Sequence, residues 1–333
     1  MRDRLSEQIV RFQETAAAVK ELDALQSLAT VASERGYCRP EMHEGFSLTI
    51  REGRHPVVEA TSRDLFVPND TELDEDARMM IITGPNMAGK STYMRQVVLI
   101  VLLEHMGSFV PAAQAKIPLC DRIFTRVGAS DDLAAGQSTF MVEMSEMASI
   151  LRFATPRSLL ILDEIGRGTS TFDGLSIAWA TAEYILKEKR LGCKTLFATH
   201  YHELSELEGR LAGVVNYQVT VRERGDEVLF LRKIQRGGAD SSFGVQVAAM
   251  AGLPQALISR AREIMAKLEV NNVNGQTIGK NILGGEKEDK QISLMEYGAV
   301  DFAQEVANLD MDSLSPREAL NLLYVLREKA RKI

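Results

Sequence analysis

The stretch from residue 79 to about residue 104 constrains the fold more than any other part of the sequence. Residues 79–83 form a short apolar run of the kind found in strands buried on both faces, and a turn follows from Gly84. From Thr92 onward, apolar residues lie on one side of an expected helix. Two later apolar runs, 159–162 and 195–198, flank a helical stretch from residue 174 to about 189. Strand, helix and strand with short connections imply a parallel sheet, so the expected fold class is α/β.

The turn between the first strand and its helix has the pattern of a phosphate-binding loop. The pattern G-x-x-x-x-G-K-[ST] is matched by Gly84, Pro85, Asn86, Met87, Ala88, Gly89, Lys90 and Ser91. In such a loop the backbone N–H groups surround phosphates, Lys90 reaches the β- and γ-phosphates, and the Ser91 hydroxyl binds Mg²⁺. The pattern alone should arise by chance in about one chain of this length in a hundred. Its place between a strand and a helix makes an incidental glycine turn a poor alternative.

Polar residues follow the next two expected strands. Asp163 and Glu164 come directly after the run 159–162, and His200 ends the strand after it. In a parallel sheet these residues lie on the same edge as Lys90. Asp163 suits the Mg²⁺ shell, commonly through water, and Glu164 suits orienting and deprotonating a water molecule. His200 suits contact with the γ-phosphate or the water. An acid pair in a loop or a single histidine is usually structural, and the phosphate loop favours the functional interpretation here.

A polar, glycine-containing segment at residues 130–140 runs into a helix with a methionine stripe. Its simplest interpretation is a capped helix whose methionines pack on the core. The N-terminus of this helix, at Ser138, is also suited to bind an anion, such as the nucleotide of a second subunit.

Composition limits the remaining possibilities. The chain has 333 residues, about two domain lengths, and its 39 basic and 46 acidic residues give a net charge of -7. That charge argues against a surface that is basic throughout, although a local basic face stays possible. The cysteines, Cys38, Cys120 and Cys193, form no CxxC pair and are expected to be buried or inert thiols. No apolar run is long enough to span a bilayer, so we expect a cytoplasmic protein with no membrane partner.

Long strings of residues then resemble one family. Residues 84–96, 138–144, 163–171 and 199–201, together with 53–56 and 252–254, look like the MutS family of DNA mismatch repair ATPases. The resemblance implies a P-loop NTPase fold of the ABC type, with a mixed central sheet, preceded by a long helix and followed by helical elements. It also implies a homodimer with two composite sites for ATP and Mg²⁺, or a tetramer formed through the tail.

The resemblance assigns roles to individual residues. The catalytic set is Glu164, His200 as γ-phosphate sensor, and Lys90. The nucleotide contacts run from Gly84 through Asn86 to Thr92, and Ser138 acts in trans on the partner's γ-phosphate. Mg²⁺ is held by Ser91 and Asp163, partly through water. An aromatic and an aliphatic residue pack on adenine in the family, which here are Phe66 and Val67. A histidine often completes that contact, and this chain carries Arg232 instead, which can also stack on a base.

The resemblance also divides the chain into parts. Residues 1–40, which lack Gly and Pro before Gly36, form a long helix at the end of a lever domain, and residues 41–235 form the ABC-type ATPase domain. Residues 236–270 resemble a helix-turn-helix dimerisation element. Residues 271–290 are expected to be a flexible linker because they have little apolar content and no period. Residues 291–333 form a small helical tail, in which Gln291 to Met295 resembles the peptide that docks on the replication sliding clamp.

The family implies further partners. These are mismatched double-stranded DNA in the full-length protein, a MutL-type protein and the sliding clamp. The domains that read a mismatch come before the ATPase in the family, so we expect this chain to be a C-terminal piece of a bacterial, nucleoid-associated protein.

Other functions remain open at this stage. One is an interaction module that dimerises and docks on the sliding clamp with little ATPase or DNA activity. Non-mismatch paralogues of the family usually end in a nuclease-like domain, for which the last 43 residues (333 minus 290) are too short. Other ABC-type repair ATPases carry a Leu-Ser-Gly-Gly signature, where this chain has Gly-Gln-Ser-Thr-Phe at 136–140. A simple P-loop kinase would need neither the Ser138 helix nor His200.

Overall fold

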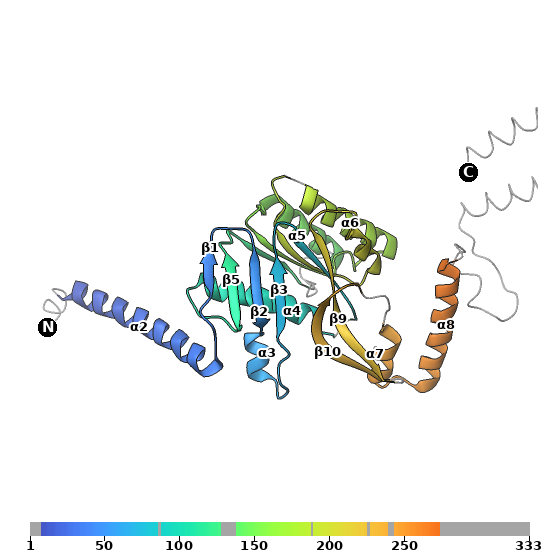
Figure 1. Ribbon diagram of the computed structural model, residues 1–333, viewed down its shortest axis with the longest axis horizontal. Helices are drawn as coiled ribbons and strands as arrows, with labels where there is room; N and C mark the ends of the chain where they lie inside the picture. Colours follow the sequence, from blue (N-terminus) through green and yellow to red (C-terminus); the bar gives the residue numbers. More distant parts are fainter. Residues whose placement is uncertain are drawn as a thin grey trace, which may run out of the picture. The chain divides into compact units, whose positions relative to one another are not determined.

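A computed structural model describes residues 8–85, 88–127, 138–187, 189–224, 227–238 and 243–273 (Figure 1). The chain divides into two units, residues 1–261 and 262–333, and the account below concerns the first. The expected linker beyond residue 273 and the tail, including Gln291 to Met295, lie outside the described residues, as do Asn86 and Met87.

The helices and strands follow one another in mixed order. They are α2 (Ile9–Arg35), β1 (Glu41–His43), β2 (Leu48–Gly53), α3 (Pro56–Thr61), β3 (Asn69–Leu73), β4 (Met79–Thr83), α4 (Lys90–His105), β5 (Gln114–Pro118), β6 (Ile123–Arg126), α5 (Thr139–Phe153), β7 (Leu159–Asp163), α6 (Thr171–Lys187), β8 (Lys194–Ala198), the 3₁₀ helix η1 (His202–Leu207), β9 (Val214–Arg224), β10 (Glu227–Arg236), α7 (Gly244–Met250) and α8 (Gln255–Val273).

The central sheet has six strands in the order β10-β9-β4-β8-β7-β6. Neighbouring strands from β9 to β6 run parallel, and β10 pairs with β9 in the antiparallel direction. Every residue of β4, β7 and β8 is buried, as expected for strands covered on both faces. The predicted α/β fold with a mixed central sheet is therefore confirmed.

Alternate residues of the central strands face two separate cores. Met80 and Ile82 of β4 pack in one core with α4 and with the strands of a smaller sheet, ordered β1-β5-β2-β3. Met79 and Ile81 pack in the other core with α5 and α6. The central sheet thus lies between α4 with the small sheet on one face and α5 with α6 on the other (Figure 1). This arrangement leaves the ends of the strands open for a site.

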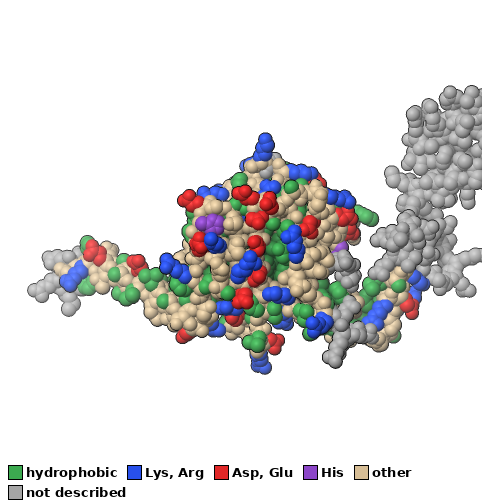
Figure 2. Space-filling model, viewed as in Figure 1, with side chains coloured by type: hydrophobic (Ala, Val, Ile, Leu, Met, Phe, Trp, Pro, Cys, Tyr) green, Lys and Arg blue, Asp and Glu red, His purple; other side chains and the backbone are tan. Residues whose placement is uncertain are grey.

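The surface carries charges of both signs. On the face seen in Figure 2, acidic and basic side chains are interspersed, in keeping with the net charge of -7. The apolar side chains of α2 are largely exposed, and Ala32 is its one buried residue among those described. No helix in the described part of the chain is long and apolar enough to cross a membrane.

Candidate active site

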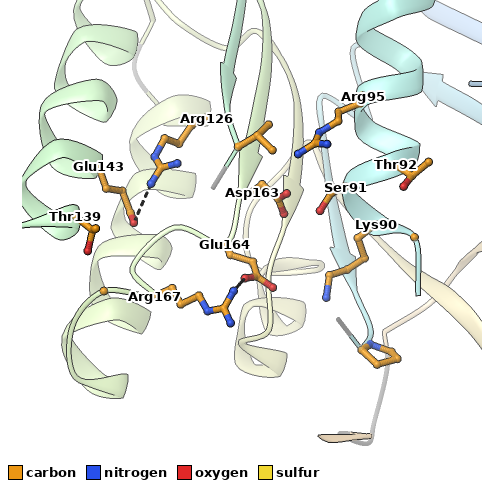
Figure 3. Close-up of a pocket in the computed structure, with 14 residues that line it drawn as sticks. Lys90, Ser91, Thr92, Arg95, Arg126, Thr139, Glu143, Asp163, Glu164 and Arg167 are labelled. Carbon is orange, nitrogen blue, oxygen red and sulfur yellow. Dashed lines mark hydrogen bonds and ion pairs between the residues drawn. The ribbon is translucent and has the colours of Figure 1, made fainter. Parts of the chain in front are cut away.

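A cavity of about 560 Å³ opens at the carboxyl ends of β4, β6 and β7 (Figure 3). Figure 3 shows Lys90 and Ser91 on one side of it, Arg126 and Glu143 on the other, and Asp163 between them. The lining residues are Pro85, Gly89, Lys90, Ser91, Thr92, Arg95, Arg126, Val127, Thr139, Glu143, Asp163, Glu164, Arg167 and Gly168. The structure therefore brings the sequence-predicted residues of the loop after β4 together with the acid pair at the end of β7.

Lys90 is the first residue of α4 and is buried. Its Nζ donates a hydrogen bond to the carbonyl oxygen of Gly84. Burial lowers the pKa of Lys90, while the nearby carboxylates of Glu164 and Asp163 oppose that effect. The loop around it depends on glycine, because Gly84 and Gly89 have φ angles of 130° and 109°. The N-terminus of α4 and a buried ammonium thus face the same cavity.

Asp163 ends β7 and is buried beside Ser91. Burial raises the pKa of Asp163, and a hydrogen bond from the Ser91 hydroxyl partly offsets the rise. Its Oδ1 atom is buried with no hydrogen-bond partner among the described residues. A buried carboxylate oxygen without a partner is unfavourable unless a ligand or water satisfies it. A hydroxyl and a carboxylate are the hard oxygen donors that suit Mg²⁺.

Glu164 lies in the left-handed region of backbone space, with φ of 54°. Its N–H donates to the carbonyl oxygen of Ala198 at 2.9 Å, which ties it to β8. Its carboxylate accepts a hydrogen bond from Arg167 Nη1 at 2.6 Å. A non-glycine residue held in this conformation is a form of strain that occurs most often at functional sites.

His200 follows β8 and is exposed beside the cavity rather than part of its lining. Its ring lies 4.1 Å from the ring of Tyr201. Partial removal from water lowers the pKa of His200, while the charge of Glu164 opposes this and that of Lys90 adds to it. His200 is therefore close enough to the central charges to sense them.

A second cavity, of about 280 Å³, adjoins the first and shares Gly89 and Thr92 with it. Phe66, Val67 and Arg232 line it together. Its other lining residues are Val58, Ser62, Leu65, Asn69, Tyr93 and Gln96. The structure thus brings Arg232 to the adjacent residues Phe66 and Val67, which precede it by 166 (232 minus 66) and 165 (232 minus 67) positions in the sequence.

Ser138 caps α5 by accepting a hydrogen bond from the N–H of Met141 at 3.2 Å. Ser138 is exposed and does not line the main cavity, whereas its neighbour Thr139 does. The burial of the methionine side chains differs along α5: Met147 is buried, whereas Met141 is 54% exposed. The capped helix was expected from the sequence, and its N-terminus lies at the rim of the cavity.

Sequence reasoning assigned no role to several lining residues. These are Arg95, Arg126, Val127, Thr139, Glu143, Arg167 and Gly168. Arg126 is the last residue of the short strand β6, which lacks the continuous apolar run by which a buried strand can be recognised from sequence. Glu143 interrupts the apolar face of α5. An acidic residue on such a face is a sequence signal for a buried, paired carboxylate, and it could have predicted this residue.

Comparison with known proteins identifies the chain. The fold and cavity define an α/β protein with a mixed sheet and a charged site at the ends of its parallel strands. The family model "MutS domain V" matches residues 80–269, and "DNA mismatch repair protein MutS C-terminal region" matches residues 303–329. The chain belongs to the MutS family, as its sequence motifs predicted.

Three curated relatives called "DNA mismatch repair protein MutS" illustrate the similarity. The protein of Ruminiclostridium cellulolyticum is 57% identical over 99% of this chain, and that of Acetivibrio thermocellus is 53% identical over 99%. The protein of Caldicellulosiruptor bescii is 52% identical over 100% of this chain. The matched regions span 38%, 38% and 39% of these relatives respectively. The chain therefore covers less than half the length of these relatives.

Proposed function

We propose that this chain binds ATP with Mg²⁺ and hydrolyses it, as the ABC-type P-loop ATPase of a DNA mismatch repair protein. The observation that carries the proposal is that one cavity is lined by Lys90, Ser91, Asp163 and Glu164 together. The names of the relatives support the mismatch repair role.

The loop 84–91 and the start of α4 bind the phosphates in this proposal. Helix N-termini favour anions because their N–H groups are unpaired and carry partial positive charge. Lys90 adds a full charge at the same place. Asn86 and Met87, which lie outside the described residues, belong with Ala88 to the same sequence motif, and Thr92 borders both cavities. Bound phosphates would also offset the unfavourable free energy of burying the Lys90 ammonium.

Mg²⁺ would be held by Ser91 and Asp163, partly through water. The unpartnered Oδ1 of Asp163 fits this assignment. The described residues contain no group of three or more His, Cys, Asp or Glu suited to a metal. Mg²⁺ usually takes one or two carboxylates and completes its shell with water and phosphate oxygens. When bound, the ion neutralises charge on the phosphates.

Glu164 orients a water molecule and accepts its proton as the water oxygen bonds to the γ-phosphorus. The bond between that phosphorus and the bridging oxygen breaks, and ADP and phosphate leave. Lys90 and His200 stabilise charge on the γ-phosphate. The proton on Glu164 then passes to solvent. Phe66, Val67 and Arg232 hold the adenine in the second cavity.

The proposal also includes the assembly of the protein into a dimer and its partners. Residues 236–270 would form the dimer element and Ser138 would reach the partner's γ-phosphate, which its exposure at the N-terminus of α5 permits. Residues 41–235 form the ATPase domain, and residues 1–40 belong to the lever. In the full-length protein mismatched DNA, a MutL-type protein and the sliding clamp are the partners. The clamp would bind the peptide Gln291 to Met295, and the tail would support tetramers.

Glu164→Gln tests the proposal. Loss of a general base should lower the kcat for ATP by roughly 10²- to 10⁴-fold, and ADP binding should persist because Lys90 and the loop are intact. Glu183→Gln, a change of the same type on the surface of α6, is the matched control and should keep full activity. Unchanged hydrolysis in Glu164→Gln would refute the role given to Glu164.

A further inference from the structure

Both polar backbone atoms of Gly166 are bound by side chains from other elements. Its N–H donates to Glu143 Oε1 at 2.6 Å, and its carbonyl oxygen accepts from the Tyr201 hydroxyl at 3.0 Å. Both hydrogen bonds are buried. Gly166 stands between Glu164 and Arg167, which are themselves paired. The loop that carries the proposed base is therefore held through its backbone.

Glu143 belongs to α5, one turn after Thr139 at the rim of the cavity. Its second oxygen pairs with Arg126 Nη2 at 3.3 Å, as the dashed line in Figure 3 shows. The side chains of Arg126 and Glu143 are only 5% and 6% exposed. Both carboxylate oxygens are thus engaged, and a charged acceptor in a water-poor site makes a strong hydrogen bond.

Tyr201 directly follows His200 and is buried. Burial, together with the negative charge of Glu143, raises the pKa of Tyr201, so its hydroxyl stays protonated and can donate at neutral pH. Gly174 of α6 closes the remaining side of this cluster. A Cβ atom there would come closer than 3.0 Å to the Tyr201 hydroxyl and to the Gly166 carbonyl oxygen. Gly166 therefore has little room to move while these contacts last.

We propose that Glu143 and Tyr201 are positioning residues that set the place of Glu164 by holding the backbone of Gly166. The inference rests on the proposed function, because hydrolysis is what makes the place of Glu164 matter. Glu143 lies on the helix capped by Ser138, and Tyr201 adjoins His200.

A purely structural role for these contacts predicts a different outcome. If Glu143 and Tyr201 only stabilise the fold, their loss lowers the melting temperature and leaves the kcat of the folded enzyme unchanged. If they position Glu164, their loss lowers kcat and leaves the KM for ATP nearly unchanged, because Lys90 and the loop 84–91 are not touched.

The chain offers a matched control at Glu146. This residue is also on α5 and also pairs with Arg126, at 3.0 Å from its Nε, but its side chain is 53% exposed. No described hydrogen bond joins Glu146 to Gly166. Glu146→Gln thus changes the charge around Arg126 without changing the support of Gly166.

The experiment compares steady-state ATP hydrolysis by Glu143→Gln, Tyr201→Phe and Glu146→Gln in the full chain. A displaced base should reduce kcat by about 10- to 100-fold in the first two variants, with KM changed by less than about threefold. Glu146→Gln should match the parent protein. Unchanged kcat in Tyr201→Phe and Glu143→Gln, or an equal loss in Glu146→Gln, would overturn the inference.

Hydrogen–deuterium exchange of the Gly166 amide separates this inference from the proposed function. The amide should exchange faster in Glu143→Gln than in the parent protein or in Glu146→Gln, whether or not the chain hydrolyses ATP. Faster exchange in a chain with no ATPase activity would refute the proposed function while leaving the hold on Gly166 intact. Equal exchange rates in all three proteins would refute the claim that Glu143 restrains the backbone of Gly166.

Discussion

The side chain of Asn69 holds the backbone of Arg232, because its Nδ2 donates to the Arg232 carbonyl oxygen at 2.9 Å. Its Oδ1 accepts from the N–H of Ile234 at 2.8 Å. Between Phe230 and Ile234 the pairing of β10 with β9 shifts register, and Arg232 takes a φ angle of 55° there. Asn69 therefore stabilises the irregular segment that brings Arg232 to the second cavity.

Replacing Asn69 by Ala should destabilise the protein by about 2–4 kcal/mol, because the buried N–H of Ile234 and the partly buried carbonyl oxygen of Arg232 lose their partner. Urea unfolding measures the change, and ADP affinity should fall as well because Arg232 is released. Glu72→Ala in the same strand is the control. Glu72 makes a surface ion pair with Arg51, so its loss should change stability by less than about 1 kcal/mol.

Arg232→Gly should separate stability from binding. Glycine adopts a φ of 55° without strain, so the free energy of unfolding should stay the same or rise by up to about 1 kcal/mol. Affinity for ADP should fall because the guanidinium no longer covers the second cavity. Calorimetric titration with ADP and with inorganic pyrophosphate measures both effects. Weakening of ADP alone is expected, and equal weakening of both ligands would contradict the assignment of Arg232 to the base.

Asp163→Asn should stabilise the nucleotide-free protein at neutral pH. Burial raises the pKa of Asp163, so between the unfolded and folded pKa values the folded state holds more protons than the unfolded state. The associated stability is present below the unfolded pKa and is lost as pH rises through the folded pKa. A neutral amide avoids that loss. The difference between the melting temperatures of the variant and the parent should therefore increase in favour of the variant as pH rises from about 4 to 8.

The exposed Asp23 of α2 supplies the control for this effect. Asp23→Asn, a change of the same type at an exposed position, should leave the melting temperature close to that of the parent. A melting temperature that is lower than the parent's at neutral pH in Asp163→Asn would argue against an unfavourable buried carboxylate.

Gly174→Ala should reverse the usual effect of this substitution in a helix. Alanine normally favours a helix over glycine by about 1 kcal/mol. At Gly174 the new Cβ would clash with the Tyr201 hydroxyl and the backbone of Gly166, so a loss of about 1–3 kcal/mol is expected. Gly244→Ala in α7 is the control, because nothing lies within 4 Å of its Cβ position. Thermal unfolding that places both variants above the parent would contradict the close packing.

Local patterns in the sequence predicted the parts of the site that lie on continuous segments. The runs that became β4, β7 and β8 could be recognised because a short apolar strand must be covered on both faces. The glycine-containing loop 84–91 and the acid pair 163–164 could be located because each stands at the end of such a strand. Hydrophobic periodicity carries this information locally, so no tertiary contact was needed to find Lys90 or Glu164.

The tertiary structure alone decided which distant groups share the site. Asn69 and Arg232 are 163 residues apart, and Gly166 is held by residues 23 and 35 positions away. Arg126 is the last residue of a strand too short to be recognised from sequence, and its partner Glu143 lies on a helix that looks amphipathic. Such contacts depend on how strands and helices pack and on where buried polar atoms find partners. The sequence by itself therefore determined the family and the positions of the loop 84–91 and the acid pair, whereas three-dimensional packing determined the contacts around Gly166 and the place of Arg232.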